Sequence, residues 1–185
     1  GCRMVDPRNV ALKHALFVAF TVAEGATLSM FGVAGGPVLQ KAGLYTMGIF
    51  LALSLVALNA KSERFLYMGG ALYSALTVMV IASFASMGLG MFGKMPRTVA
   101  AMDALILWGG LALFTAFLLY HTQVVLSHAK QFEALEGSVK AVTTVAGPRG
   151  KPTPDYINES LHLYMDLINI FIRLVMIFSG NQKRR

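Results

Sequence analysis

Charged residues are scarce in this sequence of 185 residues. Only 14% of them are Asp, Glu, Lys or Arg, whereas a soluble domain of this size carries about 25%. The hydrophobic fraction is 56%, and the mean hydropathy is +0.61. A single cysteine, Cys2, excludes a disulfide within the chain. Together these deficits favour an integral membrane protein over a soluble one.

Sequence motifs of enzymes and of nucleic-acid binding are also missing. There is no nucleophile constellation, phosphate loop or dinucleotide fingerprint, so we expect neither an enzyme nor a cofactor. The four histidines lack metal-ligand spacing within one element, which argues against zinc. The net charge is +7, with basic residues in short connectors and at the two ends. This distribution suits anionic lipid headgroups better than nucleic acid, so the expected partner is the bilayer.

Five apolar segments are long enough to cross a bilayer as helices. They cover residues 15–39, 43–60, 65–92, 104–120 and 154–180. Strand signals and internal repeats are absent, so residues 1–185 are predicted to form one all-helical membrane domain. The first residue is Gly1 rather than Met, from which we expect an N-terminally truncated chain.

Connectors between these segments are short except for one. The turn-prone Gly35-Gly36-Pro37 interrupts the first segment, and a connector with Lys41 separates it from the second. Asp103 is expected in the first turn of the fourth. After His121 the helical pattern of the fourth segment can continue as an amphipathic protrusion. Residues 137–154, rich in proline and glycine, are predicted to form a flexible loop, and Asp155 to cap the final helix.

The final segment combines a bilayer-crossing apolar run with polar side chains. Its polar residues follow a spacing of four, three and four, which places them in one stripe of a helix: His162, Asp166, Asn169 and Arg173. A charged side chain at membrane depth normally faces a bundle interior, a partner or water. We therefore expect this helix at the centre of the bundle, with its polar stripe facing other helices or an ion path.

Four ionisable side chains lie at membrane depth, namely Glu24, His121, Asp166 and Arg173. Asp166 is the strongest functional candidate, because carboxylates inside membranes mark ion and proton paths; the alternative is a structural ion pair. Arg173 either shares that role or extends to the nearby helix end. His121 gains a function only if it meets Asp166 and forms a pH-sensitive pair. Glu24 is either a proton-carrying carboxylate or a partner for Arg173.

Three stretches resemble the Bax inhibitor-1, or transmembrane BAX inhibitor motif, family. LYMDLINIF at 163–171 resembles the family's closing helix, and LLYHTQ at 118–123 resembles its LLYDTQ motif. RFLYMGGAL at 64–72 and the basic tail are most similar to its growth hormone-inducible branch. The resemblance implies a bundle of roughly seven spans with the last helix surrounded by the others, of which about five are present here.

The resemblance also implies a function. The family is associated with pH-sensitive calcium permeation and suppression of apoptosis. The growth hormone-inducible branch is associated with calcium/proton exchange and cristae organisation at the mitochondrial inner membrane; the endoplasmic reticulum is the alternative location. The family's pH sensor is a pair of aspartates. The second matches Asp166, a tentative Ca²⁺ ligand, whereas His121 replaces the first.

Two hypotheses from different functional classes follow. The first is a cation permease or calcium/proton exchanger in which Asp166 binds the ion, His121 gates it, and Glu24 supplies a possible replacement carboxylate. A histidine offers little to Ca²⁺, which prefers oxygen ligands, so calcium affinity at the pair is expected to weaken. The second is a non-transporting scaffold that acts through membrane-protein partners, with Asp166 holding the bundle together.

Overall fold

The computed structural model describes residues 10–60, 63–91, 96–146 and 156–182, and every element in these ranges is helical. Two 3₁₀ helices, η2 (Met30–Ala34) and η3 (Glu63–Met68), precede the second and third long helices. The five long helices are α1 (Val10–Ser29), α2 (Gly36–Asn59), α3 (Gly69–Met91), α4 (Pro96–Ala146) and α5 (Tyr156–Gln182). The predicted all-α class is thus confirmed.

All five long helices contain a stretch that is long and apolar enough to span a membrane. These stretches run for 21 to 35 residues, against about 20 needed for a bilayer. Large apolar side chains lie exposed on the outer surface of the bundle, among them Val33, Tyr67 and Met91, which are 95%, 88% and 82% exposed. Such a surface would be poorly solvated by water and is suited to lipid, so the chain is an integral membrane protein.

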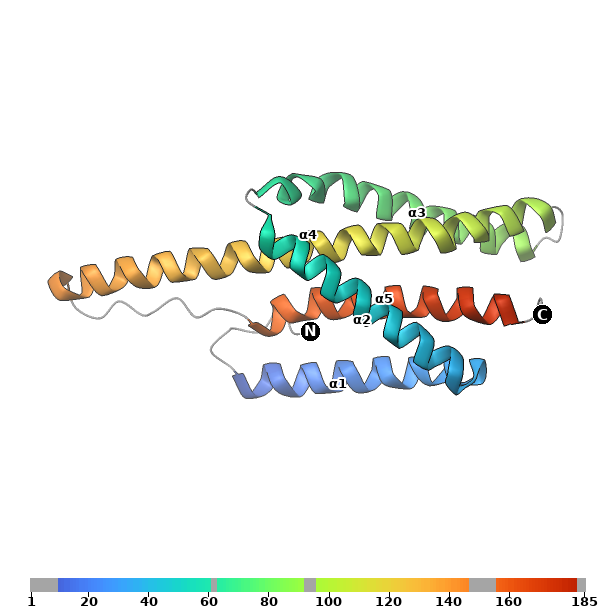
Figure 1. Ribbon diagram of the computed structural model, residues 1–185, viewed down its shortest axis with the longest axis horizontal. Helices are drawn as coiled ribbons and strands as arrows, with labels where there is room; N and C mark the ends of the chain where they lie inside the picture. Colours follow the sequence, from blue (N-terminus) through green and yellow to red (C-terminus); the bar gives the residue numbers. More distant parts are fainter. Residues whose placement is uncertain (1–9, 61–62, 92–95, 147–155, 183–185) are drawn as a thin grey trace.

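Helix α5 occupies the central position that its polar stripe predicted. It lies between α4 and α1, and α2 crosses over both α5 and α4 (Figure 1). Helix α3 packs against the opposite side of α4, and α4 runs antiparallel to α5 (Figure 1). The α4–α5 interface therefore forms the middle of the bundle, with other helices packed around it.

The buried core joins α2, α4 and α5. Its fully buried side chains include Leu118 of α4 together with Ile170 and Val175 of α5, and Ala42 of α2 allows that helix to approach closely. A second cluster around Phe117 fixes α3 against α4. Because lipid is as apolar as these side chains, close packing rather than the hydrophobic effect holds such helices together.

The boundary between the first two helices differs from the prediction. The expected segments 15–39 and 43–60 were separated at Lys41, but α1 ends at Ser29 and α2 begins at Gly36. The physical cause is Gly35, whose φ of 88° only glycine adopts readily. Pro37 follows in the first turn of α2, where a missing N–H costs nothing. The predicted connector around Lys41 is consequently helical.

Two predictions about α4 also need correction. The helix continues through Gly137 to Ala146, so the predicted loop at 137–154 started too early; its remainder and the expected cap Asp155 lie outside the described residues. Because α4 begins at Pro96, Asp103 lies beyond the first turn. Its carboxylate accepts a hydrogen bond from Ser86 of α3 instead of stabilising the helix dipole. The predicted protrusion after His121 is present and extends past the other helices (Figure 1).

The backbone at Gly35 provides a test of the α1–α2 corner. Gly35→Ala should destabilise the fold by about 1 to 3 kcal/mol, because its backbone angles are nearly restricted to glycine. Thermal unfolding in detergent micelles measures the effect. Gly36→Ala is the matched control, since a Cβ there meets open space and its φ is not positive. Equal stability of the two variants would show that the corner is not strained.

Candidate functional site

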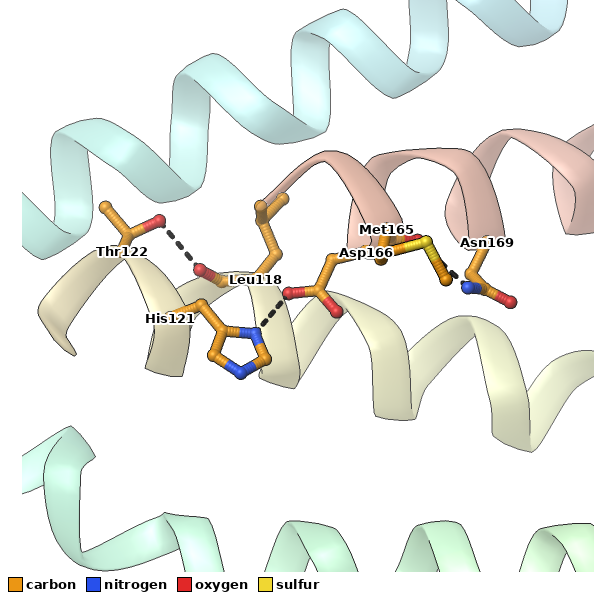
Figure 2. A network of polar contacts seen from close by, with 6 residues as sticks. All are labelled: Leu118, His121, Thr122, Met165, Asp166 and Asn169. Carbon is orange, nitrogen blue, oxygen red and sulfur yellow. Dashed lines mark hydrogen bonds and ion pairs between the residues drawn. The ribbon is translucent and has the colours of Figure 1, made fainter. Parts of the chain in front are cut away.

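A histidine and an aspartate meet at the α4–α5 interface. His121 Nδ1 lies 2.6 Å from Asp166 Oδ2, and both side chains are buried, with 8% and 4% of the residue exposed (Figure 2). Each comes from the middle of a helix that is apolar on most other faces, so neither can reach bulk water. The contact satisfies a polar group on each helix and fixes the register between them.

Aromatic rings enclose the imidazole of His121. It stacks on Phe117 with centroids 5.5 Å apart and on His162 of α5 with centroids 4.8 Å apart, and Tyr120 lies 5.2 Å away. The first stack is nearly parallel, at 18°. These rings restrict the rotation of the imidazole and keep Nδ1 directed at Asp166. His162 therefore belongs to the site through its contact with His121.

The pair can hold one proton between its two atoms. Either the imidazole donates to a carboxylate, or a protonated carboxyl donates to the imidazole, because Nδ1 can act as donor or acceptor. The other ring nitrogen, Nε2, is buried and has no hydrogen-bond partner in the part of the chain that the structure describes. A buried polar atom of this kind is a point where a proton or a water molecule can enter.

The remaining residues of the predicted stripe do not join this pair. Asn169 donates a hydrogen bond back to the carbonyl of Met165 on its own helix (Figure 2). Arg173 contacts a different part of α4, where it donates a hydrogen bond to the carbonyl of Ile106, 2.7 Å away. The stripe thus divides into two parts: His162 and Asp166 face His121, while Arg173 forms a separate contact.

Glu24 does not approach the pair in this structure. Its carboxylate interacts electrostatically with Tyr164 of α5, and Phe20, one turn earlier on α1, packs edge-on against the same tyrosine. Within the described residues no ion pair joins Glu24 to Arg173 or brings it to Asp166. Helix α1 contacts α5 at Tyr164, whereas Asp166 faces α4. The carboxylates of Glu24 and Asp166 therefore belong to different helix interfaces.

The sequence analysis missed Gln123, which ties the site to α2. Its buried amide donates a hydrogen bond to the carbonyl of Ala57, near the end of α2 where backbone carbonyls lack helical partners. Gln123 closes the LLYHTQ stretch and lies two residues after His121. Its presence in that motif was the available signal, and the structure adds the reason: it fixes α2 beside the pair.

Protein ligands for a resident metal are few at this site. Among the described residues no three His, Cys, Asp or Glu side chains are placed to hold a metal ion. Ca²⁺ prefers six to eight oxygen ligands, and the pair offers it one carboxylate. A calcium ion here would keep most of its water, as expected for a transported ion.

Comparison with known proteins identifies the family. A family model described as "Inhibitor of apoptosis-promoting Bax1" matches residues 2–184. The chain belongs to this Bax inhibitor family. It is 34% identical to growth hormone-inducible transmembrane protein of Rattus norvegicus over 94% of this chain and 45% of that protein. It is 27% identical to Bax inhibitor 1 of Homo sapiens over 83% of this chain and 53% of that protein.

The Bax inhibitor family membership confirms the resemblance inferred from the LYMDLINIF and LLYHTQ stretches. The chain spans about half the length of these curated relatives. The expected total of roughly seven spans stays a prediction, since the described residues contain five. No solved structure matches the chain.

Loss of one member of the buried pair should cost more than loss of both. His121→Phe keeps the ring stack but leaves Asp166 buried without its partner, and should destabilise the fold by about 3 kcal/mol. Combining it with Asp166→Leu should recover most of that loss, because no polar group is left unpaired. A double-mutant cycle tests this expectation. It compares the free energy of unfolding in detergent of the native chain, both single variants and the double variant. A double variant no more stable than His121→Phe would contradict the pairing.

Proposed function

We propose that this Bax inhibitor family member carries cations across a membrane in a pH-sensitive way, as a calcium/proton exchanger. The single observation that supports the proposal is the buried His121–Asp166 contact at membrane depth. A carboxylate inside a bilayer is costly and is characteristic of ion and proton paths. Asp166 is the proposed ion-binding and titrating group, and His121 is its gating partner.

Competition for one carboxylate couples the two ions. In the described conformation Asp166 contacts His121, and on this proposal the two groups share one proton that neutralises the carboxylate. A calcium ion that binds Asp166 must displace that contact, because like charges so close together repel one another. Binding of calcium therefore releases the proton, and return of the proton releases calcium. Such exclusive occupancy is what an exchanger requires.

The histidine sets the limits of this chemistry. The imidazole is a second protonatable group beside Asp166, and on this proposal it keeps the pair sensitive to pH. It offers no oxygen to Ca²⁺, so calcium affinity should be lower than at a pair of carboxylates. Glu24 would supply a second carboxylate only if α1 moved, because it now lies beside Tyr164.

For the membrane location, we propose the mitochondrial inner membrane, with the endoplasmic reticulum as the alternative. Similarity to growth hormone-inducible transmembrane protein over 94% of the chain supports the first choice, because the resemblance implied that branch's location. The family model's description, inhibitor of apoptosis-promoting Bax1, supports a role in restraining apoptosis.

The second candidate function is a membrane scaffold without transport. Two observations favour it: Asp166 is already in contact with His121, and the described residues offer no group of three metal ligands. In that case Asp166 serves only to join α4 to α5, and cristae organisation or apoptosis control depends on partner proteins. Capture of membrane partners that survives Asp166→Asn, with no flux in either form, would favour this function.

Calcium uptake into liposomes tests the exchanger between about pH 6 and pH 8, where histidine titrates. Uptake by the native protein should rise with pH, because fewer protons compete for Asp166. Asp166→Asn should abolish this pH-dependent uptake while the protein still inserts. Glu133→Gln is the matched control, since this exposed carboxylate lies on α4 beyond the membrane-spanning stretch. Unchanged uptake in Asp166→Asn would remove the proposed role of Asp166.

Restoring a carboxylate at the partner position separates the two functions. His121→Asp should raise calcium uptake by about tenfold, because it adds oxygen ligands next to Asp166. A tenfold change corresponds to about 1.4 kcal/mol of binding free energy. The same uptake assay compares it with the native protein. If only His121→Asp takes up calcium, the native site does not transport and the scaffold becomes the better assignment.

A further inference from the structure

Arg173 is held in the space between α3, α4 and α5, away from the His121–Asp166 pair. One terminal nitrogen, Nη1, donates to the carbonyl of Ile106 at 2.7 Å, and the other, Nη2, lies 3.7 Å from Met79 Sδ on α3. The guanidinium carbon is 5.1 Å from the ring centre of Phe114. Backbone, sulfur and aromatic ring thus position a permanent positive charge inside the bundle.

Within the described ranges, the groups that contact this charge are neutral. In the described ranges Arg173 has no carboxylate partner, and its Nε is buried without a hydrogen bond. Asp103, one turn before Ile106 on α4, accepts a hydrogen bond from Ser86 instead. Charged side chains at membrane depth pair with an opposite charge or with backbone carbonyls, and Arg173 has a carbonyl, which leaves its net charge uncompensated. The charge of Arg173 therefore remains available to act on other ions in the interface.

A glycine provides the room for the guanidinium. A Cβ built at Gly110 would overlap three guanidinium atoms of Arg173, whereas one built at Gly109 would make ordinary contacts, the nearest at 3.8 Å. Any side chain at position 110 would push the guanidinium out of its present place. Because the overlapping atoms are the far end of a flexible side chain, this displacement need not disturb the helices.

Arg173 lies between the level of Asp166 and the membrane side where α5 ends. Arg173 follows Asp166 by seven residues on α5, a rise of about 10 Å. Between their levels the interface is filled by Phe117, Leu118 and Ile170, which are 2%, 0% and 0% exposed. An ion that leaves Asp166 in this direction meets an apolar barrier and then a positive charge. In the opposite direction along α5, one turn before Asp166, the ion meets the polar side chain of His162.

We infer that Arg173 is a tethered cation that restricts the passage of metal cations between Asp166 and the membrane side where α5 ends. Gly110 leaves the room that its guanidinium occupies. This inference rests on the proposed cation permeation and names a specificity-determining residue for it. Repulsion by a fixed charge is proportional to the charge of the approaching ion. Arg173 therefore hinders a divalent cation more than a monovalent one, and its removal should favour calcium over potassium.

Two substitutions at position 173 separate charge from shape. Arg173→Gln keeps a hydrogen-bond donor for the Ile106 carbonyl but removes the charge, and Arg173→Lys keeps the charge. In liposomes at one pH, Arg173→Gln should raise calcium uptake about tenfold, equal to about 1.4 kcal/mol of barrier, with a smaller rise for potassium. Arg173→Lys should stay near the native rate.

Displacement of the intact arginine gives an independent test. Gly110→Ala should raise calcium uptake, while the matched Gly109→Ala should leave it unchanged. Adding Gly110→Ala to Arg173→Gln should give no further rise, because there is no longer a guanidinium to displace. This pair of glycine variants keeps the inference testable even if Arg173→Gln fails to insert.

The outcomes distinguish this inference from the proposed exchanger. Equal uptake by native and Arg173→Gln, whether both conduct or both are silent, overturns the inference, as does an equal rise in Arg173→Lys. A selective rise in Arg173→Gln supports it even when native uptake is undetectable. Loss of pH-dependent uptake in Asp166→Asn decides the exchanger separately, because that comparison leaves Arg173 unchanged.

Discussion

The cost of a charge inside a bilayer is the constraint on which this bundle depends. Asp166 can lie at membrane depth only because α4 brings His121 within 2.6 Å of it. The ring stack on Phe117 and His162 then holds the imidazole in place. Close packing of α4, α5 and α2 buries the pair, and Gln123 extends this polar join to the end of α2. The same contact thus determines helix register and the chemistry of the site.

Two positively charged or protonatable groups act on the α4–α5 interface from different levels. His121 contacts the carboxylate directly, and on the proposed function it acts through a proton that the two groups share. Arg173 does not touch the carboxylate and faces Ile106 and Gly110 further along α4. Its charge does not vary with pH, because a guanidinium keeps its proton in proteins. The interface therefore combines one pH-sensitive group and one constant barrier.

Periodicity in the sequence predicted the class of fold and the importance of Asp166. A polar stripe on an apolar helix requires burial, and α5 is indeed central. Pairing with His121 could be expected only through the family resemblance, because it depends on the rotation of two helices. The start of α2 was misplaced because the turn at Gly35-Gly36-Pro37 was interpreted as an interruption within one apolar segment, whereas Gly35 separates two helices. The separation of Glu24 from Arg173 likewise follows from packing, which a single sequence does not encode locally.

If the proposed exchanger is correct, the histidine at the position of the family's first aspartate changes which ion the pair prefers, without removing its response to pH. A pair of carboxylates can lose its shared proton and then attract a divalent cation with both groups. An imidazole that loses its proton becomes neutral, so only Asp166 attracts the cation, and most of its ligands must be water. Protons then compete more successfully, which shifts the balance of the site from calcium towards protons. Arg173 acts in the same direction on the inference above, because a fixed positive charge repels divalent cations more strongly than monovalent ones.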